Sequence, residues 1–441
     1  MADAVINIIG GGLAGCEAAY QVSKRGVKVR LFEMKPVRYS PAHQMEGLAE
    51  LVCSNSLKAK NIDNASGLLK EEMRLVDSLI IKAAEASAVP AGGALAVDRN
   101  VFSDYITKAL EDDGNIEIIR QEVEHISDLP QADGLIIATG PLTSDALAKE
   151  VAEMTGNDSL SFYDAAAPVV MYDSINHEKA FKAARYGKGS ADYINCPMNK
   201  EEYLAFYDAL INAEKADVEG FDDLKLYEGC MPVESMAKRG VETLRFGPLK
   251  PVGLELADGS TAYAIVQLRQ DNAEGTLYNL VGFQTRLKFG EQKRVFGMIP
   301  GLENAEYARY GVMHRNTYIK SPGLLDSTYR MKASDMPIYF AGQITGVEGY
   351  IESSSSGLVS GINCARTVLG LAPVVFPVST MIGALAEYAS GYAGKDFQPM
   401  GANFGIMKSD APELSKKIRD KSMRKMIAAE RALEVIRRIE Q

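Results

Sequence analysis

The chain has 441 residues, a length that allows two or three domains with a substantial hydrophobic core. Hydrophobic residues make up 46% and charged residues 24%, which is typical of a globular protein and excludes a disordered or fibrous chain. The formal net charge of −10 excludes a general positive field, so a nucleic-acid partner would need a local basic patch.

The first predicted elements are a strand at 5–9, a glycine-rich turn, a helix that continues to Arg25 and a second strand at 27–33. The turn consists of Gly10, Gly11, Gly12, Leu13, Ala14 and Gly15. This βαβ unit predicts an α/β fold with a Rossmann-like, doubly wound parallel sheet that binds a dinucleotide.

Each glycine of the G-x-G-x-x-G pattern has its own expected role in such a turn. Gly10 permits the tight turn, Gly12 lets backbone N–H groups approach a pyrophosphate, and Gly15 lets the helix pack closely on the strand. Glu33, at the end of the second strand, is expected to accept hydrogen bonds from a ribose diol. Its charge would repel a 2′-phosphate, so the pattern favours FAD or NAD over NADP.

Further strands are predicted at 134–138 and 338–341, with Gly140 just after the first of them as another cofactor contact. The region between these strands has a different pattern of predicted elements. It contains helix-like stretches at 178–185 and 201–214, followed by strand-like pieces from about 244 to 287.

A second glycine-rich segment at 342–350 precedes a predicted helix of small residues at 357–365. Its predicted cofactor contacts are Gly342, Gln343, Gly346, Glu348, Gly349 and Tyr350. Two such turns, more than 300 residues apart, favour FAD because this long cofactor is held at both ends of its domain. Tyr350 either lies against the isoalloxazine ring or packs in the core.

This organisation predicts a discontinuous FAD-binding domain of residues 1–150 and 325–441, with an α+β substrate or RNA domain of residues 151–324 inserted into it. Residues 408–441 contain ten Lys or Arg and six Asp or Glu, and are expected to form a basic C-terminal helix. A solvated helix with ion pairs is the simpler interpretation of this charge. The basic cluster Arg286, Lys288, Lys293 and Arg294 is ambiguous in the same way.

The five cysteines include no C-x-x-C pair, which argues against a disulfide framework and against a metal site. Cys16 and Cys364 are expected in the core, and Cys196 stays open. Cys53 and Cys230 lie in polar or Gly/Pro-bounded loops and are the candidate catalytic thiols. Their spacing does not choose between thiol–disulfide redox chemistry and covalent addition to a substrate.

The N-terminus lacks the pattern of a signal peptide, so a reducing cytoplasm is expected. The uncharged run between Arg366 and Glu387 carries two prolines near its middle and is interpreted as buried core instead of a membrane span.

Several blocks of the sequence closely resemble the folate- and FAD-dependent tRNA uracil-5-methyltransferases, which are similar to the flavoproteins that modify the wobble uridine of tRNA. These blocks are Gly10–Glu17, Cys53–Leu57, Gly67–Met73, Val89–Arg99, Asn195–Met198, Glu228–Pro232 and Gly342–Tyr350. One segment departs from the family, because Arg286 and Phe289 stand where His and Trp are expected.

The resemblance implies methylation at C5 of a T-loop uridine in tRNA, with FAD, 5,10-methylenetetrahydrofolate as carbon donor and NADPH or NADH as reductant. It also implies that the flavin carries methylene and hydride, that Cys230 adds to uracil C6, and that Cys53 serves as base or protects the flavin adduct. No membrane and no obligate protein partner are expected. The alternatives are the same chemistry on ribosomal RNA, or a flavin oxidoreductase acting on a small amine or a disulfide.

Overall fold

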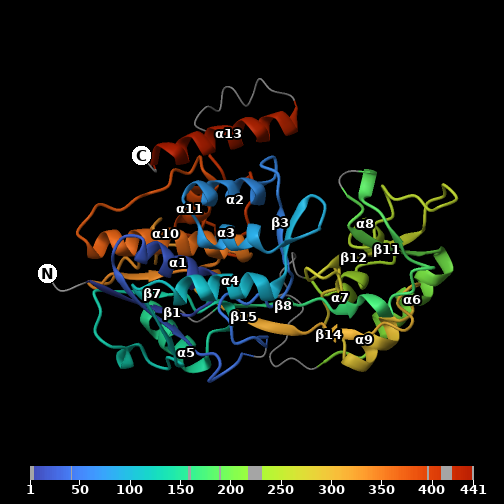
Figure 1. Ribbon diagram of the computed structural model, residues 1–441, viewed down its shortest axis with the longest axis horizontal. Coiled ribbons are helices and arrows are strands. Elements are labelled where there is room, and N and C mark those ends of the chain that lie inside the picture. The colour runs from blue at the N-terminus through green and yellow to red at the C-terminus, as the bar shows by residue number, and fades with distance from the viewer. Residues whose placement is uncertain are drawn as a thin grey trace.

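The computed structural model describes residues 4–40, 42–156, 160–187, 190–216, 231–394, 397–408 and 420–439. Figure 1 shows two groups of elements side by side. One group surrounds a parallel sheet and contains both ends of the chain, and the other surrounds an antiparallel sheet formed by the middle of the chain.

The parallel sheet has the strand order β16-β7-β1-β2-β6. Its strands are β1 (Val5–Ile9), β2 (Lys28–Glu33), β6 (Ile116–Arg120), β7 (Gly134–Ile137) and β16 (Ile338–Phe340). Every neighbouring pair in it is parallel. The side chains of Ile6 and Ile8 in the central strand are fully buried, as expected for a sheet covered by helices on both faces. The predicted doubly wound parallel sheet is confirmed.

Two helices that begin at the two glycine-rich segments, α1 (Leu13–Ser23) and α10 (Tyr350–Val368), pack directly on each other. Glycine makes this contact possible. A Cβ at Gly357 would lie 2.1 Å from the carbonyl oxygen of Ala14, and one at Gly361 would lie 2.6 Å from that of Ala18. The close contact therefore fixes the two glycine-rich segments relative to each other.

The other helices of this group cover the sheet and the α1–α10 pair (Figure 1). They are α2 (Ala65–Leu75), α3 (Leu79–Ala86), α4 (Arg99–Glu111), α5 (Asp145–Thr155), α11 (Met381–Gly391) and α13 (Lys421–Ile439). A small antiparallel sheet is formed by β3 (Ser56–Ala59), β5 (Ala94–Val97) and β4 (Ala88–Val89). The predicted C-terminal helix is present as α13, which packs on α2 through buried residues such as Ala432 and Ile436.

The antiparallel sheet has the order β10-β11-β12-β13-β9-β14. Its strands are β9 (Val169–Met171), β10 (Phe181–Lys182), β11 (Tyr193–Met198), β12 (Ala264–Gln270), β13 (Leu277–Leu280) and β14 (Tyr307–Arg309). The helices beside it are α6 (Lys200–Asn212), α7 (Val233–Ala237), α8 (Thr243–Phe246) and α9 (Phe289–Phe296). A separate antiparallel pair, β8 (Leu160–Ala165) with β15 (Met313–Tyr318), connects the two groups. Short 3-10 turns are η1 (Ile126–Asp128), η2 (Gly140–Leu142), η3 (Tyr172–Ser174), η4 (Arg185–Gly187) and η7 (Gln343–Thr345).

The predicted helix at 201–214 corresponds to α6, but the predicted helix at 178–185 is wrong. This segment contains the edge strand β10, which pairs with β11. The buried side chain of Asn195 donates hydrogen bonds of 3.2 Å to the carbonyl oxygens of both Phe181 and Ala183. These tertiary hydrogen bonds outweigh the local preference of Glu, Lys and Ala for a helix.

The strand-like stretch from 244 to 287 contains β12 and β13, although Leu244 itself lies in α8. The strands of the antiparallel sheet all lie between Val169 and Arg309, within the predicted insertion of residues 151–324. The exact boundaries of the two domains stay a prediction. Among the described residues, no helix is long and apolar enough to cross a membrane.

Candidate active site

A pocket with about 1050 Å³ of empty space lies over the parallel sheet, and its lining residues follow the carboxyl ends of all five strands. This edge is where open α/β sheets bind ligands. The predicted cofactor residues that line it are Gly10, Gly11, Gly12, Leu13, Ala14, Glu33, Gly140, Gly342, Gln343 and Tyr350. Gly15, Gly346, Glu348 and Gly349, also predicted as cofactor contacts, are not among its lining residues.

The first glycine-rich turn has the geometry that its sequence requires. Gly10 has a φ of 105°, and a Cβ there would lie 2.5 Å from the carbonyl oxygen of Ala138. A Cβ at Gly15 would lie 1.8 Å from the carbonyl oxygen of Gly10. At Gly12, by contrast, a Cβ would meet no heavy atom within 4 Å, and no side chain caps the N-terminus of α1. The positive end of α1 is therefore open to the pocket and suited to a pyrophosphate.

The carboxylate of Glu33 is buried and held by two backbone groups. It accepts hydrogen bonds from the N–H of Gly11 at 2.7 Å and from the N–H of Lys35 at 3.0 Å. An ionised carboxylate has further lone pairs, so these bonds leave acceptor capacity for a ribose. The contact with a ribose stays a prediction.

A second buried carboxylate, Glu50, supports the same wall of the pocket. It pairs with the ammonium group of Lys35 at 3.3 Å and accepts hydrogen bonds from the N–H groups of Gln44 and Met45. His43 lies beside this pair, and burial lowers the pKa of its imidazole, which favours the neutral form. The ion pair between Lys35 and Glu50, together with the backbone hydrogen bonds to Glu50, thus holds this wall of the pocket in place.

The second glycine-rich segment contains three glycines in the left-handed φ region. The φ values are 87° at Gly342, 82° at Gly346 and 119° at Gly349. The N–H of Gly342 donates to Ser356 Oγ at 2.6 Å, and Gln343 Nε2 donates to Glu348 Oε2 at 2.5 Å. Gly346 and Glu348 therefore shape the turn, while Gly342 and Gln343 face the pocket.

Tyr350, the first residue of α10, connects the pocket to the segment that carries Cys53. Its hydroxyl accepts a hydrogen bond of 2.7 Å from the backbone N–H of Cys53. Tyr350 and Val52 both line the pocket. The Cys53 segment, residues 51–55, is therefore next to this end of the cofactor pocket.

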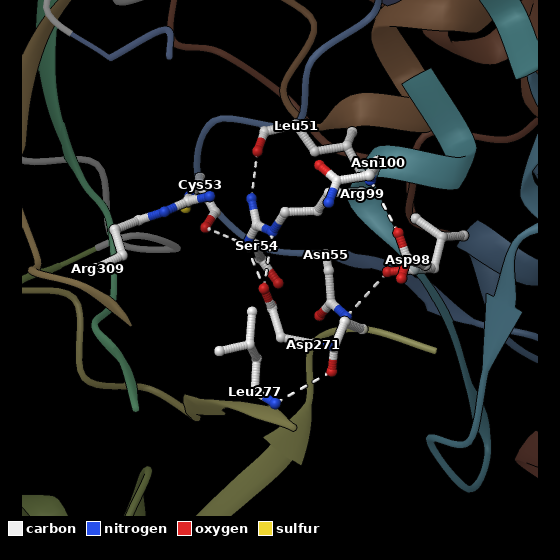
Figure 2. Close-up of polar contacts among 12 residues, drawn as sticks. Leu51, Cys53, Ser54, Asn55, Asp98, Arg99, Asn100, Asp271, Leu277 and Arg309 are labelled. Atoms are coloured by element: carbon white, nitrogen blue, oxygen red, sulfur yellow. Dashed lines mark hydrogen bonds and ion pairs between the residues drawn. The ribbon is translucent and has the colours of Figure 1, made fainter. Parts of the chain in front are cut away.

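Arginines from helix α4 and from the antiparallel sheet hold the Cys53 segment (Figure 2). Arg99 of α4 donates to the carbonyl oxygens of Leu51 and Cys53, the latter at 3.0 Å. Arg309 of β14 reaches the segment from the other side and donates to the carbonyl oxygen of Val52 at 3.2 Å. Arg269 of β12 donates to Ser54 Oγ at 2.7 Å and to Asn55 Oδ1 at 3.2 Å.

Arg99 is itself paired, in an ion pair of 3.1 Å with Asp271. Burial lowers the pKa of Arg99, but Asp271 and Tyr350 raise it by more, so the net shift is upward. Burial, and then the charge of Arg99, lower the pKa of Arg309. Three arginines and one aspartate therefore surround the Cys53 segment, and neighbouring basic side chains are typical of reactive thiolates.

The thiol of Cys53 is half-buried and donates to the carbonyl oxygen of Ala165 at 3.6 Å. Cys16 and Cys364 are fully buried, as predicted, and burial raises the pKa of both thiols. Cys196 is also buried, with a pKa raised by burial to about 12. These three thiols are therefore inert core residues.

Cys230 lies outside the described residues, but the chain just after it is described. The N–H of Val233 donates to the carbonyl oxygen of Gln284 at 2.7 Å, and the N–H of Thr285 donates to that of Ala166 at 3.4 Å. Ala166 directly follows Ala165, which accepts from the Cys53 thiol. The described residues after Cys230 are thus linked through backbone hydrogen bonds to the environment of Cys53.

The sequence analysis did not identify Arg99, Arg269, Arg309 or Asp271 as site residues. Arg99 ends the block Val89–Arg99, one of the blocks that resemble the family, and directly follows Asp98, which caps α4, so the sequence did contain a local indication of its role. Arg269 and Arg309 lie on strands far from Cys53 in the sequence, and only the tertiary fold brings them to it.

The chain is similar to a known protein family and to curated enzymes. Residues 5–372 match the family described as glucose inhibited division protein A. The chain is 62% identical over 433 residues to the methylenetetrahydrofolate–tRNA-(uracil-5-)-methyltransferase TrmFO of Acetivibrio thermocellus, covering 98% of each chain. It is 56% identical over 443 residues to the enzyme of the same name from Staphylococcus carnosus, covering 100% of both.

Among solved structures, Aquifex aeolicus GidA in its form II crystal superposes with a TM-score of 0.69. The match covers 99% of this chain and 73% of that chain at 16% sequence identity. At this level of identity, the similarity shows a shared fold.

Proposed function

The chain belongs to the glucose inhibited division protein A family, and we propose that it is a FAD- and folate-dependent enzyme that methylates C5 of a uracil in tRNA. The structural observation that carries the proposal is the hydrogen bond between the N–H of Cys53 and the hydroxyl of Tyr350. This hydrogen bond places the segment of the Cys53 thiol next to the predicted dinucleotide pocket, and methylation of this kind needs both a thiol and a flavin. We also propose that a nicotinamide reductant is used and that the enzyme acts in the cytoplasm.

The residues that line the pocket include groups that would hold FAD. The open N-terminus of α1 at Gly12 would hold the pyrophosphate, and Glu33 would accept from the ribose. Gly342, Gln343 and Tyr350, which also line the pocket, would contact the cofactor from the second glycine-rich segment. When bound, the flavin supplies the transfer of a one-carbon unit and of hydride.

The thiols supply the covalent step on the base. Carbon C6 of uracil is the β carbon of an unsaturated carbonyl, so a thiolate adds there and makes C5 nucleophilic. C5 then forms a bond to the one-carbon unit and loses its proton, and hydride delivered to the new carbon expels the thiolate from C6, which restores the double bond and completes the methyl group. We assign the addition to Cys230, and to Cys53 the role of base or of protecting the cofactor adduct.

The residues around Cys53 position it for this role. Arg99 and Arg309 fix the backbone of residues 51–53, and their charges stabilise negative charge that develops nearby. Among the described cysteines, Cys53 is the only one that is not buried, which gives no support to a dithiol oxidoreductase built from these residues.

The test is methyl transfer with a labelled carbon donor. The FAD-loaded protein would be incubated with NADPH, labelled methylenetetrahydrofolate and, separately, tRNA and ribosomal RNA transcripts. Label at C5 of a tRNA uridine is the expected result. Label only in ribosomal RNA would show that ribosomal RNA, and not tRNA, is the substrate. Label in neither RNA would favour a small-molecule oxidoreductase.

A further inference from the structure

Three aromatic rings form a stack that ends at the protein surface. Phe289, the first residue of α9, lies on Tyr310 with ring centroids 4.6 Å apart and planes inclined by 18°. Tyr310 lies on Tyr307 at 5.0 Å and 8°. Phe289 is 55% exposed, so the outer end of the stack is accessible to solvent. A flat ring held in this way can accept another flat ring.

The stack is held by a buried glutamine. Gln292 donates hydrogen bonds of 2.8 Å to the carbonyl oxygens of Leu287 and Gly311, and accepts one of 2.9 Å from the N–H of Gly311. The hydroxyl of Tyr307 donates to the backbone carbonyl oxygen of Gln292 at 3.3 Å. These bonds join α9 to the chain on both sides of Tyr310. The stack is therefore formed before any ligand binds, which lowers the entropic cost of binding.

The position of the stack relates it to the active site. Tyr307 and Tyr310 flank Arg309, whose guanidinium donates to the carbonyl oxygen of Val52 beside Cys53. Phe289 lies five residues after Gln284 in the chain. The carbonyl oxygen of Gln284 accepts a hydrogen bond from the N–H of Val233, which lies three residues after Cys230. Both segments that carry the rings thus contact a segment next to a candidate catalytic thiol.

The charge around the stack is positive. Lys293 is exposed and lies four residues after Phe289, so both side chains are on the same face of α9. Nearby, Arg294 pairs with Glu291 at 2.7 Å and Lys288 pairs with Glu214 at 2.8 Å. The run 286–294 contains four basic residues and one acidic residue. The exposed ring of Phe289 can stack on a nucleobase, and the ammonium group of Lys293 can pair with a phosphate of the same nucleic acid.

We propose that Phe289 stacks on a nucleobase of the RNA substrate close to the reacting uridine, and that Lys293 contacts the RNA backbone. The proposal rests on the proposed function, and it assigns a positioning role to the stack. Phe289 holds the RNA so that the uridine reaches the thiols. A single-stranded base fits this site because every base has a flat face that can stack without sequence-specific hydrogen bonds.

The test compares Phe289→Ala, Phe289→Trp and Phe246→Ala in the full-length, FAD-loaded protein. Phe246 in α8 is 84% exposed and has no ring stacked on it among the described residues, so it is a matched control. Binding of a tRNA transcript would be measured by fluorescence anisotropy at fixed salt. We expect Phe289→Ala to weaken binding about 10-fold, Phe289→Trp to retain or strengthen it, and Phe246→Ala to leave it unchanged.

Two results would overturn the proposal. One is unchanged tRNA affinity in Phe289→Ala. The other is a raised KM for methylenetetrahydrofolate with unchanged tRNA affinity, which would assign the ring to the aromatic part of the folate. The flavin absorbance spectrum checks that each variant is folded and loaded. If the unmodified protein methylates no RNA, the proposed function fails, whereas normal methylation with unchanged binding by Phe289→Ala contradicts the stacking role alone.

Discussion

The backbone N–H of Cys53 and the hydroxyl of Tyr350 form a hydrogen bond of 2.7 Å between residues 297 positions apart in the chain. Tyr350 begins the helix that follows the second glycine-rich segment, and it lines the pocket. The position of the Cys53 segment therefore depends on the same helix that closes one end of the cofactor site.

Replacement of Tyr350 by Phe removes the hydroxyl and keeps the ring. The Cys53 N–H then loses its acceptor, and we expect the rate of methyl transfer to fall about 5-fold while FAD content stays normal, because one hydrogen bond contributes about 1 kcal/mol. Tyr388→Phe is the matched control, since its hydroxyl donates to the carbonyl oxygen of Gln398 and Tyr388 does not line the pocket. Equal rates in both variants would show that the bond does not position Cys53.

Replacement of Cys230 by Ala tests the proposed nucleophile. Without a thiol to add to C6, methyl transfer and the covalent RNA complex are expected to disappear. Reduction of the flavin by NADPH is expected to stay near normal, because it does not involve the base. Gel analysis of the RNA complex and stopped-flow absorbance measure the two effects. Full turnover by this variant is incompatible with the assignment.

Alanine at Gly12 and alanine at Gly15 should affect different properties, FAD binding in the first case and protein stability in the second. A Cβ at Gly15 would lie 1.8 Å from the carbonyl oxygen of Gly10, so Gly15→Ala is expected to destabilise the protein even without cofactor. A Cβ at Gly12 meets no heavy atom within 4 Å, so Gly12→Ala should fold normally and bind FAD more weakly. Thermal unfolding of the apoprotein and FAD titration separate the two effects. Normal FAD affinity in Gly12→Ala would argue against a pyrophosphate at this turn.

The pH dependence of stability should include a contribution from Glu72. Its carboxylate accepts 2.8 Å bonds from the N–H groups of Met381 and Ile382 at the start of α11, and burial raises its pKa from 4.5 to about 8. Between these pH values the folded state binds the proton more strongly than the unfolded state, so this contribution to stability falls as pH rises.

The variant Glu72→Gln is neutral at every pH and should lack this decline. We expect the unmodified protein to lose stability relative to Glu72→Gln when the pH is raised from 5 to 8. Urea unfolding of the FAD-loaded proteins at several pH values measures the difference. A difference that is constant across this range would contradict the upward shift in pKa.

Local signals in the sequence were sufficient for the parallel sheet and for one wall of the pocket. Gly10, Gly15 and Glu33 lie within 24 residues. Gly15 packs against Gly10, and Glu33 accepts a hydrogen bond from Gly11 of the same turn, so the spacing of these residues in the sequence is enough to predict this part of the pocket. The burial of Cys16 and Cys364 also followed from their apolar helical neighbours.

The remaining features depend on contacts between distant segments. The charge around Cys53 comes from α4, β12 and β14, and no local pattern connects these elements. The segment 178–185 has the composition of a helix, but its hydrogen bonds with Asn195 and β11 make it a sheet edge. The ring stack also could not be predicted, because Phe289 and Tyr310 meet only after α9 packs beside β14.

The ion pair between Arg99 and Asp271 has a mechanical consequence. Arg99 begins α4 next to the parallel sheet, whereas Asp271 directly follows β12 of the antiparallel sheet, and both side chains are buried. Any motion that separates the two halves at this junction must break this ion pair and also move Arg99 relative to the carbonyl oxygen of Cys53, to which it donates.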